Sequence, residues 1–332
     1  MTGFQHSRNI QGLRGFAALA VLIGHADGFG LIQVPPWLAA CGIGAADVFF
    51  VISGFIICQI VSPDHPEGGG GRAALFFLVK RCLRIYPLYW TVFAAATIGS
   101  LWLPLQYEPI ACNRETHGYI HLIGGNCLIP PVWTLQYELY FYTVIAALLL
   151  LVPRTFYATL MLLMLAQASY VVLSGYLDLP QGFLSSPLLL EFGAGCAISW
   201  LHRCGFQKWA MGSLLLGVVA FSFGAAQAID DVFYVLPRIL TFGLGGALVL
   251  HAVIMLEAKG VFAPRPIEAL GDASYSLYLC HWPLLTISAE LELGWYGVAA
   301  AIALSFACHR WIENPLGSLA LRFRELKLAH LS

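Results

Sequence analysis

The chain has 332 residues, of which 59% are hydrophobic and only 11% are charged, and its mean hydropathy is +0.76. Soluble domains carry about 45–50% apolar and about 25% charged residues, so this chain has less than half of the charge that a water-exposed surface needs. The composition disfavours a soluble enzyme, a nucleic-acid binder and a disordered chain, and it leaves a polytopic membrane protein. The net charge of −1 gives no global field that would attract a nucleic acid.

Apolar runs of about 17–25 residues predict an all-α membrane protein with about ten transmembrane helices. The predicted spans, in chain order, are roughly 10–27, 44–61, 82–103, 132–152, 155–175, 187–202, 209–228, 233–256, 270–289 and 295–312. Prolines, a glycine run and an acidic pair separate them. The sequence shows no internal repeat, so residues 1–332 are expected to form a single membrane domain.

The placement of lysine and arginine predicts the orientation of the spans, because cytoplasmic loops carry an excess of these residues. With the N-terminus inside, one side receives Arg8, Arg72, Lys80, Arg81, Arg84, Arg154, Arg203, Lys208, Lys259, Arg265, Arg310, Arg322, Arg324 and Lys327. The other side receives only Arg114 and Arg238. Both termini are therefore predicted to be cytoplasmic.

The first span carries two ionisable residues, Arg14 and His25. Eleven residues of helix bring them to within about 20° of one face and separate them by roughly 16 Å. Arg14 is then near the cytoplasm and His25 near the outer surface. Because Arg14 interrupts the apolar run and no small-x-small site follows, the span is expected to stay in the membrane and not to be a cleaved signal peptide. The alternative is a snorkelling arginine and an interfacial histidine.

Depth along the spans sorts the other polar residues into two groups, and ionisable groups within spans are functional candidates because they are costly there. The outer group is Asp47, Trp133, Glu138 and Glu191. The inner group is Arg81, Arg84, Arg310 and the segment Asp272-Ala273-Ser274, with His281 near mid-membrane. Arginine clusters suit phosphate groups, and a histidine beside carboxylates suits general-base activation of a hydroxyl. The pattern therefore indicates an anionic donor from inside and an acceptor from outside.

Structural interpretations stay open for some of these residues. Arg81 and Arg84 also fit ordinary positive-inside anchoring, and Glu191 also fits a residue that caps or lines a helix pair. Asp47 and Glu138 are harder to explain structurally, because the apolar run that follows each carries it into the bilayer.

Six motifs along the chain resemble those of acyltransferase family 3, the inner-membrane acyltransferases. They are IQGLRGFAA (10–18) ending at His25, DVFFVISGF (47–55), RCLRIYP (81–87), WTLQYELYFY (133–142), SLYLCHWP (276–283) and RWIENP (310–315). The first is similar to the family's R-x10-H helix, and together they run in order from residue 10 to 315. Tyr137 departs from the pattern, since many members carry a small or acidic residue there, but Glu138 matches.

The resemblance implies transfer of an acyl group, usually acetyl from acetyl-CoA, onto a sugar hydroxyl of an exopolysaccharide or another cell-surface glycan. Seventeen residues follow Pro315, so the chain is expected to be the stand-alone type without an SGNH-hydrolase-like domain. A multi-pass protein of the bacterial inner membrane is expected, with no metal. The acyl group, the acceptor sugar, whether the acceptor is lipid-linked, whether an acyl-His25 forms, and the oligomeric state stay open.

The residues and the resemblance together assign three roles within the expected site. The catalytic residues are His25, Asp47 and Glu138, with His25 as the base and either carboxylate orienting it. The residues expected to bind acyl-CoA are Arg14, Arg81, Arg84 and Arg310. The residues expected to bind the acceptor are Trp133, Glu191, His281 and Tyr278.

Two other classes of function compete with acyl transfer. A proton-coupled secondary transporter would use the intramembrane histidine and acids as a proton relay, but it predicts internal symmetry and paired broken helices, which the sequence lacks. A structural scaffold leaves Arg14, His25, Asp47 and Glu138 unexplained.

The nine cysteines show no zinc or thioredoxin-type spacing, and most lie within apolar runs as small buried residues. Cys112 and Cys127 differ, because they lie in the longest predicted extracytoplasmic segment. An oxidising compartment permits a disulfide between them, worth roughly 3 kcal/mol, and two unpaired thiols are the alternative.

The charge asymmetry predicts that reporter fusions placed near Arg154 and at Ser332 are active only in the cytoplasm. Paired alkaline phosphatase and fluorescent-protein fusions measure this. A periplasmic signal at Ser332 would remove one span and contradict the assignment of depth to the polar residues.

Overall fold

The computed structural model describes residues 7–61, 70–102, 128–177, 179–180, 182–183, 186–229 and 235–315. Within these ranges every regular element is a helix and none is a strand, which confirms the predicted all-α class. The proposed pair Cys112 and Cys127 lies outside the described residues.

The helices belong to two compact units, each assembled from separate stretches of the chain. The first unit comprises Met1–Gly24, Val34–Ala74 and Val144–Gly271, and the second comprises His25–Gln33, Leu75–Thr143 and Asp272–Ser332. The chain passes between the units within α1 (Arg8–Gly28), α3 (Gly71–Trp102) and α4 (Trp133–Leu151), in the segment between α1 and α2, and at the last residue of α10 (Arg265–Asp272).

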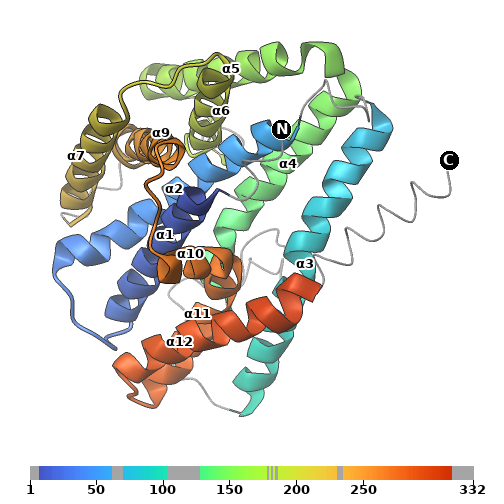
Figure 1. Cartoon of the computed structure of the whole chain (residues 1–332). Coiled ribbons are helices and arrows are strands. Elements are labelled where there is room, and N and C mark those ends of the chain that lie inside the picture. Colours follow the sequence, from blue (N-terminus) through green and yellow to red (C-terminus); the bar gives the residue numbers. More distant parts are fainter. Residues whose placement is uncertain are drawn as a thin grey trace. The chain divides into compact units, whose positions relative to one another are not determined.

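In the first unit, α2 (Pro36–Ile60) lies against α6 (Leu189–Arg203), and α7 (Ala210–Ile229) lies against α9 (Leu244–Ala258) (Figure 1). Its other elements are η3 (Pro153–Thr155), α5 (Phe156–Leu177), α8 (Val235–Arg238), the π-helical turn η5 (Ile239–Gly243) and α10 (Arg265–Asp272).

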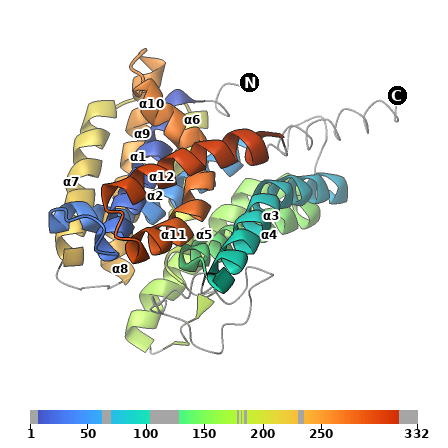
Figure 2. The ribbon, with the colours of Figure 1, turned by 90° about the horizontal axis from the view of Figure 1, so that it is seen from below.

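In the second unit, α11 (Ser274–Glu290) and α12 (Trp295–Cys308) lie side by side (Figures 1 and 2), and Phe77 of α3 packs edge-on against Tyr142 in the middle of α4. Besides these helices the second unit contains η2 (Pro130–Val132) and the π-helical turn η6 (His309–Glu313).

Five helices within the described ranges are long and apolar enough to cross a membrane. They are α2, α4 with η2, the larger part of α5 with η3, α7, and α9 with η5. In the apolar window of α2, 61% of the residues are buried within the protein, against 11% for α5, so α2 is a central helix and α5 turns most of its apolar surface outward. Both observations fit a protein embedded in lipid, whereas the total of ten spans and the cytoplasmic termini remain predictions.

Three of the predicted spans differ clearly from the observed helices. Helix α2 begins at Pro36, eight residues before the predicted start at 44. Helix α3 begins at Gly71, eleven residues before the predicted start at 82, because the apolar stretch 73–79 continues the helix between Arg72 and Lys80. Arg81 therefore lies about 15 Å along a continuous helix and not at its entry. The predicted span 270–289 is divided at Ala273 between α10 and α11.

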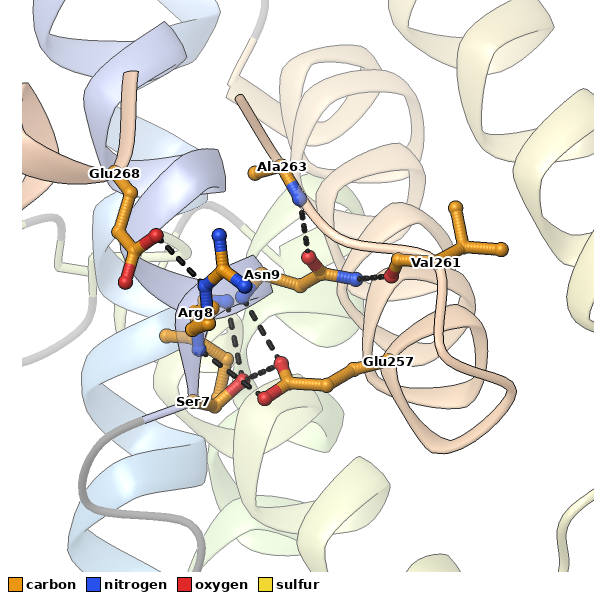
Figure 3. A network of polar contacts seen from close by, with 8 residues as sticks. Ser7, Arg8, Asn9, Glu257, Val261, Ala263 and Glu268 are labelled. Atoms are coloured by element: carbon orange, nitrogen blue, oxygen red, sulfur yellow. Dashed lines mark hydrogen bonds and ion pairs between the residues drawn. The ribbon is translucent and has the colours of Figure 1, made fainter. Parts of the chain in front are cut away.

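The N-terminus of α1 is capped by a carboxylate from the end of α9 (Figure 3). The Glu257 side chain accepts hydrogen bonds from the backbone N–H groups of Arg8 (3.2 Å) and Asn9 (2.9 Å) and from the Ser7 hydroxyl. The Ser7 oxygen in turn accepts the N–H of Ile10 at 3.2 Å. The first turn of a helix leaves its N–H groups without helical partners and carries a partial positive charge. The Glu257 carboxylate and the N-cap Ser7 accept hydrogen bonds from these N–H groups, and the carboxylate also compensates the partial positive charge.

A second set of contacts ties the same turn to the segment after α9 (Figure 3). The Asn9 amide donates to the carbonyl oxygens of Val253 (2.9 Å) and Val261 (2.8 Å) and accepts from the N–H of Ala263 (2.7 Å). The start of the helix that carries Arg14 and His25 is therefore fixed by a carboxylate and by backbone groups far along the sequence.

Helices α2 and α6 approach closely through a pair of glycines. A Cβ atom at Gly195 would lie 2.0 Å from the carbonyl oxygen of Val51, and one at Gly54 would lie 2.0 Å from that of Phe192. Small residues allow backbones to meet in membrane helix pairs, where apolar surface gives little drive for association.

We expect Gly195→Ala to destabilise the protein by about 1–3 kcal/mol, because the new methyl group forces the two helices apart. Gly212→Ala on α7 is the matched control, since its Cβ would meet Trp209 at an ordinary 3.5 Å. That variant should be neutral or slightly stabilised. The measurement is thermal unfolding of the detergent-solubilised protein. Equal melting temperatures for both variants would contradict the close helix contact.

Candidate active site

A pair of histidines brings α1 and α11 together in the second unit. The Nδ1 atom of His25 lies 2.9 Å from the Nε2 atom of His281, and the two rings are nearly parallel, with centroids 5.1 Å apart. His25 is half-buried, whereas His281 is buried. The Trp282 ring meets the His25 ring edge-on at 5.0 Å, so an apolar wall stands beside the imidazole.

The other ring nitrogen of His281 is also engaged. Its Nδ1 atom lies 2.9 Å from the carbonyl oxygen of Leu277, one turn earlier on α11. On the same helix, the Tyr278 hydroxyl donates to the carbonyl oxygen of Pro131 and lies 2.8 Å from the Thr134 hydroxyl. Tyr278 thus attaches α11 to the beginning of α4, and His281 contacts His25 directly. Both had been expected to bind the acceptor.

Arg81 is buried in the second unit between two aromatic rings. Its guanidinium carbon lies 5.4 Å from the centroid of Phe77 and 5.3 Å from that of Tyr142. Its Nε and Nη2 groups have no hydrogen-bond partner among the described residues. A buried guanidinium with unused donors is costly, so this position favours the approach of an anion or another acceptor.

Two carboxylates lie near the arginines of α3. Glu138 accepts a hydrogen bond from the Tyr142 hydroxyl one turn later on α4. Glu313 accepts one from Ser276 at 2.7 Å and pairs with His309 at 2.9 Å. Arg84 interacts electrostatically with both acids. The predicted cationic group is therefore a cluster of mixed charge, in which Arg84 faces carboxylates and Arg81 keeps two N–H groups unused.

The cluster around Glu138 continues toward the histidine pair. Glu138 interacts electrostatically with Tyr278, whose ring centroid lies 6.4 Å from that of His281. Within the second unit, Tyr278 is therefore near both Glu138 and the histidine pair.

Asp47 belongs to the first unit, where Arg238 binds it. Two guanidinium nitrogens of Arg238 donate three hydrogen bonds of 2.9–3.2 Å to the two carboxylate oxygens. Asp47 is fully buried, and so is Glu191, which interacts electrostatically with both residues. Glu191 shares a carboxyl–carboxyl hydrogen bond with Asp47, and no N–H or hydroxyl group of the described residues reaches its oxygens. The structure brings Asp47 and Glu191 together around Arg238, which was not among the predicted site residues.

The remaining predicted residues lie in different surroundings. Arg14 lies in the first unit and donates to Gln11 at 3.0 Å. Arg310 is exposed on η6, and Trp133 is 37% exposed with its ring edge-on to Tyr137.

Sequence reasoning missed Arg238 and Glu313 as members of polar clusters. Arg238 was assigned to the outer side as a topology marker, although it lies within the predicted span 233–256. Its position within a predicted span was the signal that could have marked Arg238 as a member of a polar cluster. Glu313 lies in the last quoted motif but one residue beyond the predicted span, so depth alone did not mark it.

Comparison with known proteins identifies the class. The family model of the acyltransferase domain matches residues 7–310, and the chain therefore belongs to this family, acyltransferase family 3. No solved structure matches the chain.

Named relatives cover most of the chain at low identity. One whose name describes a membrane-bound transacylase, BcsY of Komagataeibacter xylinus, is 28% identical over 302 residues, 86% of this chain and 74% of the relative. The exopolysaccharide production protein ExoZ of Rhizobium meliloti is 29% identical, covering 82% of this chain and 90% of the relative. The peptidoglycan O-acetyltransferase OatA of Listeria monocytogenes is 23% identical over 93% of this chain, which spans 55% of that relative.

The two acids near Arg238 are expected to respond differently to neutralisation. Asp47→Asn removes the charge that compensates the half-buried Arg238 and should cost about 3–5 kcal/mol, whereas Glu191→Gln should cost less than about 1 kcal/mol because the glutamine amide can still donate a hydrogen bond to Asp47. The double variant Asp47→Asn/Arg238→Gln should recover part of the loss. Thermal unfolding measures all three. A Glu191→Gln variant as unstable as Asp47→Asn would contradict this division.

Proposed function

We propose that the protein is an O-acyltransferase of the bacterial inner membrane that moves an acyl group, acetyl first among the candidates, from acyl-CoA to a sugar hydroxyl of an exopolysaccharide. The observation that carries the proposal is the placement of His25 within a member of an acyltransferase family. Its Nδ1 atom is engaged by His281, whereas its Nε2 atom has no hydrogen-bond partner among the described residues. A half-buried imidazole with one available nitrogen suits general-base chemistry.

The proposed reaction balances without a metal or an oxidant. The Nε2 atom of His25 takes the proton of the acceptor hydroxyl as the oxygen attacks the thioester carbonyl carbon. The new C–O ester bond forms, the C–S bond breaks, and the thiolate of CoA leaves. The proton on Nε2 then passes to the thiolate, so His25 returns to its neutral form. If an acyl-His25 forms first, the same nitrogen makes the bond.

Arg81 is the preferred residue for the anionic part of the donor. Its two unused N–H groups suit a phosphate oxygen, and its burial would strengthen such a contact. Arg84 faces Glu138 and Glu313, so a phosphate there would compete with two carboxylates. Arg14 and the exposed Arg310 remain candidates for additional phosphate contacts. In this proposal Arg84 keeps Glu138 in place. Trp133 and Tyr278 contact the acceptor close to Glu138.

The choice of an exopolysaccharide as acceptor rests on the relatives. ExoZ is named for exopolysaccharide production, and OatA for O-acetylation of peptidoglycan. The acceptor is therefore expected to be a glycan outside the cytoplasm, and a lipid-linked repeat unit is compatible with the proposal.

The first measurement uses purified protein in lipid nanodiscs with radiolabelled acetyl-CoA. De-O-acetylated exopolysaccharide is the acceptor, and peptidoglycan fragments are the comparison. Label transferred to the exopolysaccharide supports the proposal, and label on peptidoglycan alone would change the acceptor class. Absence of CoA release with every glycan, in a folded preparation, would contradict acyl transfer from CoA.

The two parts of the site should have different kinetic signatures. His25→Ala should reduce kcat by about 10²–10⁴-fold with donor binding little changed, because a positioned base acts in the chemical step. Arg81→Gln should instead weaken acetyl-CoA binding by about 2–5 kcal/mol, the cost of truncating a buried charged contact. Arg154→Gln, at an exposed position in η3, is the matched control and should match the parent. Loss of donor binding in His25→Ala with normal binding in Arg81→Gln would reverse the assignment.

A further inference from the structure

We propose that His281 is a positioning residue that fixes the tautomer of His25, so that Nε2, and not Nδ1, is the reactive nitrogen. The inference deepens the proposed acyl transfer and rests on it for its kinetic consequences. Its structural content, the position of one proton, stands on the hydrogen bonds alone.

The direction of the hydrogen bond between the two histidines follows from the backbone carbonyl that His281 contacts. The oxygen of Leu277 can only accept, so the Nδ1 atom of His281, 2.9 Å away, must carry the proton. A neutral imidazole protonated at Nδ1 has its lone pair at Nε2. That lone pair faces the Nδ1 atom of His25 at 2.9 Å, so His25 must donate from Nδ1. Its own lone pair then lies at Nε2, the atom without a hydrogen-bond partner among the described residues.

Packing holds the two rings in this arrangement. His281 is 1% exposed, and its ring is nearly parallel to that of His25, with a 12° angle between the planes. The edge of Trp282 lies against the His25 ring on another side. An imidazole fixed in this way cannot exchange its two nitrogens by turning over without breaking the bond to His281.

A neutral acceptor suits an apolar environment better than a carboxylate does. A carboxylate beside His25 would itself need compensation within the membrane, as Asp47 does from Arg238. The second imidazole accepts the same proton with no net charge. When His25 takes a proton at Nε2, the bond from its Nδ1 to His281 strengthens, because the donor is now an imidazolium. The His281–Leu277 pair therefore occupies the role that the sequence analysis gave to Asp47 or Glu138.

The kinetic test compares two substitutions of His281. His281→Leu removes the acceptor and should lower kcat by about 10²-fold while the KM values for acetyl-CoA and glycan change little, since loss of tautomer control affects the chemical step. His281→Gln places an amide oxygen near the Nε2 position and should restore kcat to within about tenfold of the parent. Equal loss in both variants would indicate a packing role and would overturn the proposal.

A matched control exists in the first unit. The Nδ1 atom of His251 lies 3.0 Å from the Nε2 atom of His202, and its Nε2 atom lies 3.0 Å from the carbonyl oxygen of Lys208. His251→Leu thus removes a buried histidine with the same two kinds of partner. It should leave kcat within about threefold of the parent, because it lies outside the proposed catalytic machinery. A loss as large as that of His281→Leu would show that the kinetic effect is not specific to the His25 pair.

A spectroscopic measurement separates this inference from the proposed function. Nitrogen-15 spectra of histidine-labelled protein in lipid bilayers distinguish a protonated from an unprotonated ring nitrogen, and the His25→Ala variant assigns the His25 signals. We expect an unprotonated Nε2 in the parent and a mixture of tautomers in His281→Leu. This result would stand even if no acyl transfer were detected. A proton on Nε2 of His25 in the neutral parent protein would overturn the inference, whatever the activity.

Discussion

The start of α1 is capped by the carboxylate of Glu257, which accepts the N–H groups of Arg8 and Asn9, and the Asn9 side chain holds the same turn. This interaction matters because a helix end inside an apolar protein has few other partners for its free N–H groups. The contact joins residues almost 250 positions apart in sequence. Since Arg14 lies further along the same helix within the first unit, the anchored start sets the register in which its side chain is presented.

Charge compensation in apolar surroundings explains much of the remaining polar architecture. Asp47 is matched by Arg238, and Glu313 by His309 and the nearby Arg84. The histidine pair differs, because one neutral imidazole donates a hydrogen bond to the other and neither ring carries a charge that needs compensation. Arg81 is the exception, because two of its buried N–H groups have no partner among the described residues. That exception is what makes Arg81 the preferred contact for an anionic donor.

Close backbone approach is the other constraint on the first unit. Gly54 and Gly195 let α2 and α6 meet, and α6 carries Glu191 to the cluster around Asp47 on α2. Neither glycine was singled out in the sequence, because a small residue within an apolar run looks the same whether it faces a helix or lipid. The distinction is made by the partner helix, which comes from a distant part of the chain.

The sequence by itself determined the all-α membrane class, the approximate helix boundaries and the family, because apolar length, loop punctuation and motif order are local properties. It also marked His25, Glu138 and the arginines of α3 as candidates, since ionisable groups within apolar runs are costly. Only the tertiary structure decided their partners. Asp47 pairs with Arg238, Arg84 faces Glu138 and Glu313, and His25 pairs with His281. Which polar groups satisfy one another depends on the way helices distant in sequence pack, and depth along single spans does not contain that information.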